Sequence, residues 1–482
     1  MAKFDQPIES FIKKFVTDLE EGNVAIFAGA GMSVSAGFVN WSELLRDIAN
    51  DLHLDVDREW DLISIAQYHF NEKRNRDAIN RAILEEFSAK TESTENHRIL
   101  AKLPIHTYWT TNYDILIEQA LKEAFKIVDV KYDKDQLQLA KPRRNATVYK
   151  MHGDVEHPTK AIITKQDFET YHRTHEPFIT ALSSDLTFKT FLFIGFSFTD
   201  PNLDYVLSRL SIQFGDNGRQ HYCFIRKCSR ADYKTEDEYN YELRKQTLKV
   251  NDLKRYKIEA LLIDKYSQIT EILSEIEQRF KKRTIFISGS AEEYGTMDSH
   301  AAQNFIHQLT KQLVFNGNTI VNGFGLGVGS AVINGALDAV YEKPHKHSEE
   351  QLIMRPFPQF PTGDKDLKVL WREYRYKMIP YAGISIFIFG NKKDPKTGKI
   401  IIANGVRQEF EIATELGLIP IPVAATGYMA QQIYEIVMAE PGKYYKAYEH
   451  QVVPIIKELS DPNLQSEEII KKIIDIIKIL KT

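Results

Sequence analysis

The segment "VAIFAGAGMS", residues 24–33, decides the fold of this chain. It begins as a short apolar run, which Gly29 and Gly31 stop, and the hydroxyl of Ser33 follows. A strand that ends in glycines before polar residues is a common way of presenting backbone N–H groups to a phosphate. We therefore expect a strand of a parallel α/β sheet with a ligand at its carboxyl end.

The length and composition describe a soluble protein of two domains. The chain has 482 residues, of which 43% are hydrophobic and 27% charged, and its net charge is −4. This charge offers no general attraction to nucleic acid or to an anionic membrane. The sequence has no apolar run that could span a bilayer and no secretory signal at residues 1–15. We expect a cytoplasmic protein without nucleic-acid or membrane partners.

The cysteines argue against a metal site. Only Cys223 and Cys228 occur, with His221 close by, and no second pair of ligands exists in the sequence. A structural zinc ion needs four ligands. We expect no metal.

Apolar runs alternate with amphipathic segments along the whole chain. This alternation is typical of parallel sheets covered by helices on both faces, so we predict the α/β class with two doubly wound, Rossmann-like domains. Between them, five apolar residues share one face of a helix over 269–280, and "KKR" (281–283) precedes a new strand. We place the domains at 1–282 and 283–482. The predicted strands lie in "VAIFAG", "IHTYWTTNYD", "TVYKMHGD", "TFLFIGFS" and "HYCFIRK", and then in "TIFISGS", "NTIVN", "ISIFIFG" and "IPIPVAAT".

The last segment, "SEEIIKKIIDIIKIL" (466–480), predicts an amphipathic helix with isoleucines on one face. It could pack on the body of the protein or on a partner chain, and membrane binding is a minor alternative.

Four segments at predicted strand ends carry the polar residues of the first domain. They are "GAGMS" (29–33), "TTNYD" (110–114), "MHGD" (151–154) and "GFSFTDPN" (195–202), in which Asp200 can cap a helix that begins at Pro201. Each segment alone is weak evidence, but the combination in this order is specific.

In these segments the chain resembles the sirtuin-like NAD-binding family, over residues 10–280. The resemblance implies that NAD+ is the substrate, that the first glycine loop holds its pyrophosphate, and that Asn112 and His152 face the nicotinamide ribose as catalytic residues. The NAD-binding set that we expect is Ala28, Gly29, Ala30, Gly31, Ser33, Asp114, Gly195, Ser197 and Asp200.

The chemistry of these residues agrees with that expectation. Cleavage of the nicotinamide–ribose bond passes through a cation-like ribose. The Asn112 amide can hold ribose hydroxyls or a water molecule, and the His152 imidazole can accept a proton near neutral pH. Asp114 could orient Asn112, the ribose or the backbone, or it could simply cap the strand end.

Two departures from protein-deacylating sirtuins narrow the activity. The chain cannot build their zinc module of paired cysteines, and "GFVNWSELL" (37–45) replaces their Pro-Asp-Phe-Arg stretch. Hydrolysis of NAD+ needs only NAD+ and water, so we expect an NAD+ glycohydrolase. The alternatives are a sirtuin-type deacylase or ADP-ribosyltransferase, and a non-catalytic nucleotide-binding regulator. The presence of Asn112 and His152 argues against the non-catalytic regulator.

A second glycine-rich segment, "NTIVNGFGLGVGSAVINGAL" (318–337), ends a predicted strand and enters a helix that we expect Ser330 to cap. Such a helix N-terminus can bind an anion. Tight strand–helix turns are the alternative reason for these glycines.

This second domain resembles the SLOG family of nucleotide-signal sensors, and the domain order resembles the effectors of the bacterial Thoeris anti-phage system. The resemblance implies a homotetramer that is activated by a cyclic ADP-ribose isomer, which a partner TIR-domain protein makes. Pyrophosphate favours Arg and Lys, so Arg375 and Lys392 are the cationic candidates. Glu409 could accept ribose hydroxyls or be an exposed helix charge. The expected activator set is Gly289, Ser290, Gly325, Gly327, Gly329, Ser330, Arg375, Lys392 and Glu409.

Overall fold

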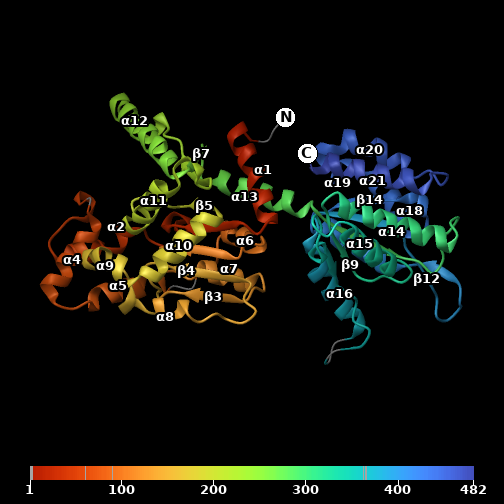
Figure 1. Cartoon of the computed structure of the whole chain (residues 1–482), viewed down its shortest axis with the longest axis horizontal. Coiled ribbons are helices and arrows are strands. Elements are labelled where there is room, and N and C mark those ends of the chain that lie inside the picture. Colours follow the sequence, from red (N-terminus) through yellow and green to blue (C-terminus); the bar gives the residue numbers. More distant parts are fainter. Residues whose placement is uncertain (1–3, 60, 89–90, 362, 364–365, 482) are drawn as a thin grey trace. The chain divides into compact units, whose positions relative to one another are not determined.

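The computed structural model describes residues 4–59, 61–88, 91–361, 363 and 366–481. The chain divides into two compact units, Met1–Glu277 (unit 1) and Gln278–Thr482 (unit 2) (Figure 1). The division lies inside helix α13 (Ser267–Lys281), which is the helix that the sequence analysis placed before the second domain.

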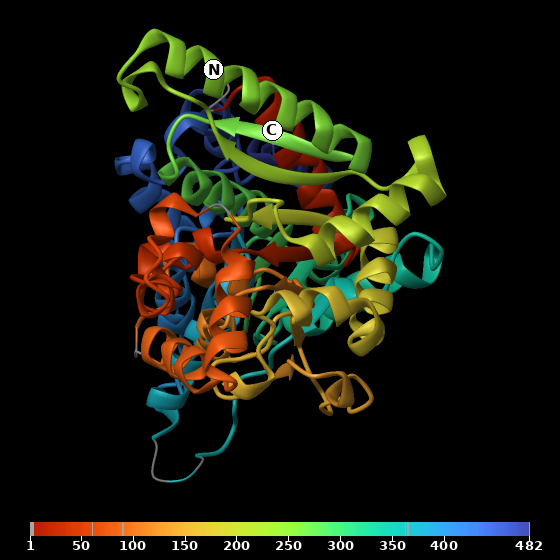
Figure 2. The ribbon, with the colours of Figure 1, turned by 90° about the vertical axis from the view of Figure 1, so that its left-hand side faces the viewer.

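Unit 1 is built on a seven-stranded sheet in the order β3-β4-β2-β1-β5-β6-β7, and all its strand pairs are parallel. Helices lie on both faces of this sheet (Figure 2). The strands are β1 (Val24–Ala28), β2 (Thr107–Thr110), β3 (Val128–Lys131), β4 (Ala146–Lys150), β5 (Thr190–Ile194), β6 (His221–Arg226) and β7 (Ile258–Ile263). The helices are α1 (Gln6–Glu20), α2 (Trp41–Leu44), α3 (Arg46–Asp51), α4 (Leu62–Lys73), α5 (Asp77–Phe87), α6 (Glu95–Lys102), α7 (Leu116–Glu123), α8 (Lys134–Leu137), α9 (Lys165–Thr174), α10 (Glu176–Phe188), α11 (Pro201–Phe214), α12 (Glu236–Leu253) and α13.

The central strands of unit 1 are apolar on both faces because helices cover both faces. Every residue of β1, β2 and β5 is buried. Trp109 of β2 stacks on Tyr149 of β4 with ring centroids 4.2 Å apart. Phe27 and Phe193 stack across β1 and β5 at 5.3 Å.

The strand register brings four strand ends into one row. Ala28 of β1 is paired with Thr110 of β2 on one side and with Ile194 of β5 on the other. Thr110 is in turn paired with Lys150 of β4. The four polar segments identified in the sequence therefore all follow strands that end at the same edge of the sheet.

Unit 2 contains a five-stranded parallel sheet in the order β10-β9-β8-β11-β14 and a small hairpin, β12-β13. Because β9 and β11 lie on opposite sides of β8, the strand order reverses between β8 and β11, where ligands bind in such sheets. The strands are β8 (Thr284–Ser290), β9 (Thr319–Asn322), β10 (Leu352–Met354), β11 (Ile384–Phe389), β12 (Asn391–Lys393), β13 (Ile400–Ile402) and β14 (Ile419–Pro422). The helices are α14 (Ser299–Phe315), α15 (Gly329–Glu342), α16 (Leu367–Met378), α17 (Asn404–Glu415), α18 (Tyr428–Ala439), α19 (Pro441–Tyr445), α20 (Glu449–Glu458) and α21 (Ser466–Lys481).

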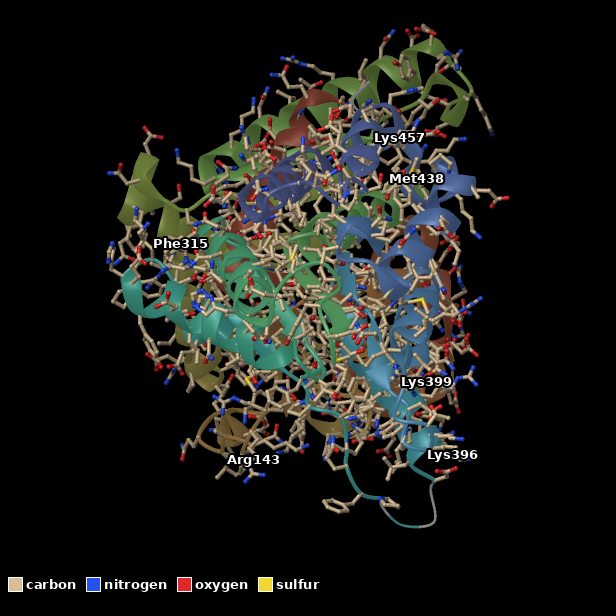
Figure 3. The ribbon with its side chains drawn as sticks, turned by 90° about the vertical axis from the view of Figure 1, so that its right-hand side faces the viewer. Arg143, Phe315, Lys396, Lys399, Met438 and Lys457 are labelled. Atoms are coloured by element: carbon tan, nitrogen blue, oxygen red, sulfur yellow. The ribbon has the colours of Figure 1, made fainter. Side chains whose placement is uncertain are left out.

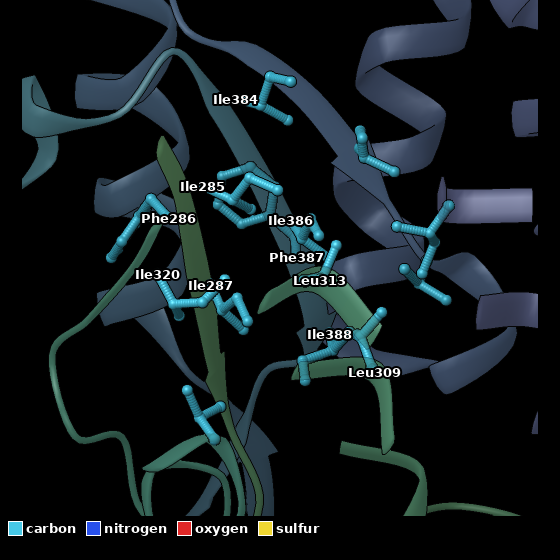
Figure 4. Close-up of a cluster of buried hydrophobic side chains, with 14 of the residues drawn as sticks. Ile285, Phe286, Ile287, Leu309, Leu313, Ile320, Ile384, Ile386, Phe387 and Ile388 are labelled. Carbon is cyan, nitrogen blue, oxygen red and sulfur yellow. The ribbon is translucent and has the colours of Figure 1, made fainter. Parts of the chain in front are cut away.

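The core of unit 2 is aliphatic. Figure 4 shows Ile285 and Ile287 of β8 among Ile386 and Ile388 of β11 and Leu309 of α14. The hairpin β12-β13 lies outside this core, and the lysines of its turn, Lys396 and Lys399, point away from the body (Figure 3).

The terminal helix α21 packs on its own unit. Ile469, Ile473 and Ile476 are completely buried in the unit 2 core, and α21 lies against α14 and α20. Of the alternatives left open by the sequence, the structure shows packing on the body. The isoleucine stripe therefore no longer argues for a partner chain.

The α/β class and both doubly wound sheets are confirmed. All nine predicted strands are present, and the sequence analysis missed β3, β7, β10 and the hairpin strands. The missed strands lie at sheet edges or outside the two sheets. A strand in such a place is covered by fewer neighbours, so its sequence need not be a continuous apolar run. Among the described residues, no helix is long and apolar enough to cross a membrane.

Candidate functional site

The glycine loop after β1 is packed tightly against the loop after β5. A Cβ atom on Gly29 would lie 2.5 Å from the Gly195 carbonyl oxygen, and one on Gly31 would lie 2.9 Å from the Gly195 Cα. Gly195 itself has φ +65°, and its own Cβ would lie 2.2 Å from the Met32 nitrogen. These three glycines are therefore required for the approach of the two loops, whatever ligand they bind.

Several N–H groups of this loop already donate to the protein. The Gly29 N–H donates to the Ile194 carbonyl at 2.9 Å, and the Gly31 N–H donates to the Gly195 carbonyl at 2.9 Å. The Met32 and Ser33 N–H groups close a short 3₁₀ turn onto Gly29 and Ala30. These four N–H groups are thus already paired within the protein.

Asn112 is held at the end of β2 by a buried polar network. Its side-chain nitrogen donates to the Gly29 carbonyl and to Ser33 Oγ, both at 3.1 Å, and its backbone N–H donates to Thr110 Oγ1 at 2.9 Å. Ser33 Oγ in turn donates to Asp114 Oδ2 at 2.8 Å. Ser33, Asn112 and Asp114 therefore form one unit across the ends of β1 and β2.

Asp114 does both things that the sequence left open for it. Its Oδ1 accepts the Leu116 N–H at 3.0 Å at the start of α7, as a cap does. Its Oδ2 orients Asn112 through Ser33. Nothing in these contacts gives it the position of a base.

His152 lies beyond the end of β4 and is 2% exposed. Its Nε2 lies 2.9 Å from Asp200 Oδ2, and its Nδ1 has no hydrogen-bond partner among the described residues. The ring meets the Phe168 ring edge to face at 5.2 Å. A buried imidazole with one nitrogen unpartnered is an available proton acceptor.

Asp200 joins His152 to the start of α11. It caps this helix by accepting the Asn202 and Leu203 N–H groups at 2.9 and 2.8 Å, and Pro201 is the first helical residue, as predicted. Burial opposes ionisation of Asp200, but the His152 imidazole and the two amides prevail and lower its pKa below the usual value. The carboxylate is therefore negative beside the imidazole. Ser197, in the same loop, is exposed and contacts Thr199 Oγ1 at 2.7 Å.

The sequence analysis missed Lys150, which is completely buried at the end of β4. Its Nζ donates to the Tyr113 and Asp114 carbonyls at 3.0 and 2.6 Å and to Asp154 Oδ2 at 2.5 Å, and it lies 3.2 Å from Glu118 Oε1. The lysine ties the segment after Asn112 to the strand that precedes His152. Its place directly before "MHGD" was the available signal, because a lysine in an otherwise buried strand needs partners.

In unit 2, the glycine-rich loop after β9 is packed on the loop after β8. A Cβ atom on Gly325 would lie 2.0 Å from the Gly289 carbonyl oxygen, and one on Gly327 would lie 2.0 Å from the Ala291 carbonyl oxygen. A Cβ atom on Gly289 would meet the Ile388 carbonyl oxygen at 2.7 Å. The tight-turn explanation therefore holds for these glycines, and it leaves a ligand role open.

Ser330 is not the cap of α15, contrary to the sequence expectation. The helix begins at Gly329, its N-cap residue is Val328, and the cap makes no side-chain hydrogen bond. The Gly325 carbonyl accepts the Val328 and Gly329 N–H groups, which sets the helix start before Ser330. The Ser330 side chain is exposed in the first turn.

Arg375 and Glu409, two of the expected activator contacts, are paired with each other. Arg375 Nε of α16 donates to Glu409 Oε1 of α17 at 3.3 Å, and Ser288 Oγ donates to Glu409 Oε2 at 2.6 Å. The Arg375 guanidinium also lies 4.8 Å from the centre of the Phe357 ring. The alternative that Glu409 is an exposed helix charge is wrong, because it is only 7% exposed.

Burial raises the pKa of Glu409 above its usual value, although Arg375 and Ser288 both act to lower it. The remaining candidates lie close to the ends of β8 and β11. Ser290 Oγ donates to the Asn391 carbonyl at 2.9 Å, and Lys392 is exposed in β12.

Family models match both parts of the chain. Residues 106–250 match the SIR2-like domain. Residues 268–480 match the Sir2- and TIR-associating SLOG family.

Three similar proteins, each named NAD(+) hydrolase ThsA, match nearly the whole chain. The protein of Bacillus cereus (strain MSX-D12) is 48% identical over 99% of both chains. That of Acinetobacter baumannii (strain 532279) is 44% identical over 99% of this chain and 100% of its own. That of Cytobacillus dafuensis is 47% identical over 98% of this chain and 97% of its own. Unit 1 has two strand-end networks, unit 2 matches the SLOG family, and the sequence identity to the three ThsA proteins extends over nearly the whole chain. The chain therefore belongs to the ThsA family of NAD+ hydrolases.

Proposed function

We propose that unit 1 hydrolyses NAD+ to ADP-ribose and nicotinamide, with Asn112 and His152 as the catalytic residues. The observation that carries the proposal is their common position. Both follow paired strands whose ends, Thr110 and Lys150, are in register, and each side chain is fixed by buried neighbours. Groups fixed in this way need little reorganisation when charge develops on the substrate.

In the proposed reaction, the bond between ribose C1′ and the nicotinamide nitrogen breaks, and nicotinamide leaves with the electron pair. A water oxygen bonds to C1′, and the water proton passes to His152 Nδ1, which has no hydrogen-bond partner among the described residues. The ionised Asp200 stabilises the imidazolium that forms. Asn112 holds the ribose hydroxyls or the water through whichever of its amide atoms faces the substrate.

The remaining parts of the proposed NAD+ site are the two packed loops. Ala28, Gly29, Ala30 and Gly31 with Ser33 form one side, and Gly195, Ser197 and Asp200 form the other. Their close contact at the β1–β5 reversal of strand order supports a dinucleotide site there.

We further propose that unit 2 binds a cyclic ADP-ribose isomer, made by a TIR-domain partner protein, and thereby switches on NAD+ destruction in a cytoplasmic homotetramer during anti-phage defence. The glycine loop after β9, which packs on the loop after β8, and the Arg375–Glu409 pair support this site. Arginine suits the pyrophosphate, and Glu409 suits ribose hydroxyls.

The test is to incubate the purified chain with NAD+ and follow nicotinamide release, with and without cyclic ADP-ribose isomers. We expect release that depends on one isomer. His152→Ala should lower the rate by about 10²- to 10⁴-fold, the usual contribution of a positioned proton acceptor. Asn112→Ala should lower the rate as well, because the ribose hydroxyls or the water are no longer held. Thermal unfolding of both variants serves as the control for folding. Undiminished release by either folded variant would remove that residue from the catalytic site.

A further inference from the structure

Helix α12 is long, polar and hardly buried. It has 18 residues, of which only Leu253 is buried. Figure 1 shows it at the rim of unit 1, beyond β7. Helices in proteins are stabilised mainly by packing of an apolar face, and a helix with so little burial lacks most of that stabilisation. A partner for its outer face would supply it.

The inner face of α12 is fastened to unit 1. The side-chain nitrogen of Gln246 donates to the Arg226 carbonyl at 2.8 Å, and its oxygen accepts the Cys228 N–H at 3.1 Å. These bonds fix the rotation of α12 about its own axis. The face that it presents outward is therefore defined.

The outward stripe combines apolar and charged side chains. Asp237, Tyr241, Arg244 and Leu248 follow one another at spacings of four, three and four residues and are all exposed, so they share one face of the helix. Tyr241 is 67% exposed and Leu248 53%. Large exposed side chains in a row, flanked by charge, are typical of a contact surface.

Most charges on α12 already have partners within unit 1. Lys245 pairs with Glu242 at 3.4 Å, Lys249 Nζ donates to the Ser197 carbonyl at 2.7 Å, and Asp252 pairs with Arg255 at 2.9 Å. The outward stripe carries one acidic residue, Asp237, near the start of the helix and one basic residue, Arg244, at its middle. The helix dipole favours Asp237 in the first turn, but it does not explain Arg244 in the middle of the outward stripe. An identical helix running in the opposite direction would present its Arg244 to Asp237.

We propose that α12 is the surface through which two copies of this chain associate, as an antiparallel helix pair about a twofold axis. With the axis between Asn240 and Tyr241, Asp237 lies opposite Arg244 of the partner subunit. Tyr241 lies beside the partner subunit's Tyr241, at the centre. Because the interface is isologous, each charged pair occurs twice. The inference rests on the self-association proposed above and adds the surface that mediates it.

The test uses the full-length chain and charge reversal. The mass in solution is measured by light scattering and sedimentation for wild type, Asp237→Arg, Arg244→Asp and the double variant. We expect an assembly in wild type, a roughly twofold lower mass in each single variant, and the wild-type mass in the double variant, because the reversed charges again meet opposite partners. Arg81→Asp on α5, an equally exposed helix position, is the matched control and should leave the mass unchanged.

A second measurement locates the axis. Under mild oxidation, Tyr241→Cys should form a disulfide-linked dimer, whereas Thr247→Cys, exposed on another face of α12, should not. An assembly whose mass none of the charge variants changes, or a double variant that does not regain the mass, would overturn the α12 interface while leaving self-association standing. A monomeric wild type would overturn both. Nicotinamide release, measured on the same samples, tests the activity separately.

Discussion

At the scale of single residues, Lys150 links the two strand ends that carry Asn112 and His152. Burial disfavours the charged lysine, but Glu118 and Asp154 outweigh this effect and raise the pKa of Lys150, so the ammonium group is retained. Its two bonds to the Tyr113 and Asp114 carbonyls fix the backbone just after Asn112. Lys150 is thus a positioning residue.

We expect Lys150→Met to destabilise unit 1 by about 3–5 kcal/mol, because the carboxylates of Asp154 and Glu118 lose their buried counter-ion. Denaturant unfolding measures this loss. Nicotinamide release by the folded protein should fall as well, with a lower kcat, because Asn112 is no longer held. Lys150→Arg keeps the charge and should recover part of both. A Lys150→Met protein as stable and as active as wild type would contradict the positioning role.

His221 predicts a dependence of stability on pH. Burial, with a smaller contribution from Arg219, lowers its pKa from 6.5 to about 3. Between these values the unfolded state binds a proton that the folded state does not, so stability falls as the pH falls. The contribution of the neutral His221 to the free energy of unfolding is complete above pH 6.5. Between pH 6.5 and about pH 3 it decreases by about 1.4 kcal/mol per pH unit.

Urea unfolding at pH 7 and pH 5 measures this slope. His221→Gln keeps an acceptor for the Phe191 N–H, which now donates to His221 Nδ1 at 3.2 Å, and it should reduce the slope. The exposed His106→Gln is the control and should leave the slope as it is in wild type. Equal slopes in wild type and His221→Gln would show that His221 is not the group responsible.

At the scale of elements, the glycines of both glycine-rich loops allow two loops to pack backbone against backbone. In each unit, the loop after the first strand of the sheet is in backbone contact with a neighbouring loop, and a Cβ atom at the contact would overlap a carbonyl oxygen. In unit 1 the contact joins the loops after β1 and β5, and in unit 2 it joins the loops after β8 and β9. Glycine is needed there for the approach of backbone to backbone, before any phosphate is considered.

The terminal helix α21 provides a test at the same scale. We expect Ile473→Ala to destabilise unit 2 by about 2–5 kcal/mol, because the residue is completely buried in the unit 2 core and its truncation leaves a cavity. The assembly mass in solution should not change. The neighbouring Ile474, which is partly buried, is the control, and its substitution by alanine should cost less. A change in mass without a loss of stability would restore the partner-chain role of α21.

At the scale of the whole molecule, the proposed switch must connect a signal in unit 2 with catalysis in unit 1. A ligand shifts an equilibrium between two states only by its difference in affinity for them. Because Arg375 is already paired with Glu409, an anionic ligand competes with this carboxylate for the guanidinium. The pair is therefore the contact in unit 2 that ligand binding would change.

We expect Arg375→Ala to weaken activation by the cyclic ADP-ribose isomer by roughly tenfold to a hundredfold, while NAD+ binding in unit 1 is retained. A lost charge-assisted contact costs about 1.5–3 kcal/mol. Titration of the isomer against nicotinamide release measures the shift. Arg407→Ala, in an exposed pair with Glu411 on α17, is the control and should respond as wild type does.

Because Arg375→Ala leaves Glu409 buried without its counter-ion, the double variant Arg375→Ala/Glu409→Gln shows whether a loss of stability in Arg375→Ala comes from that unpaired charge. It should recover stability but not activation. Activation curves for Arg375→Ala and wild type that superimpose would show that Arg375 takes no part in the sensor.

The sequence by itself determined the fold class and the place of the candidate site. The strands at the centres of both sheets are buried on both faces, so their sequences are continuous apolar runs. Glycine and polar residues follow where these strands end. Asn112, His152 and Asp200 were visible for this reason. Edge strands such as β3 and β10 carry a weaker signal because fewer elements cover them.

Only the tertiary structure decided which residues meet. Arg375 and Glu409 form a pair across two helices, Lys150 reaches the carbonyl groups after Asn112, and the isoleucines of α21 enter the unit 2 core. Each contact joins segments that are not neighbours along the chain, and no local pattern specifies its partner. A charged residue within an apolar, buried stretch of sequence needs a counter-charge. Only the register of strands and the packing of helices determine which residue supplies that counter-charge.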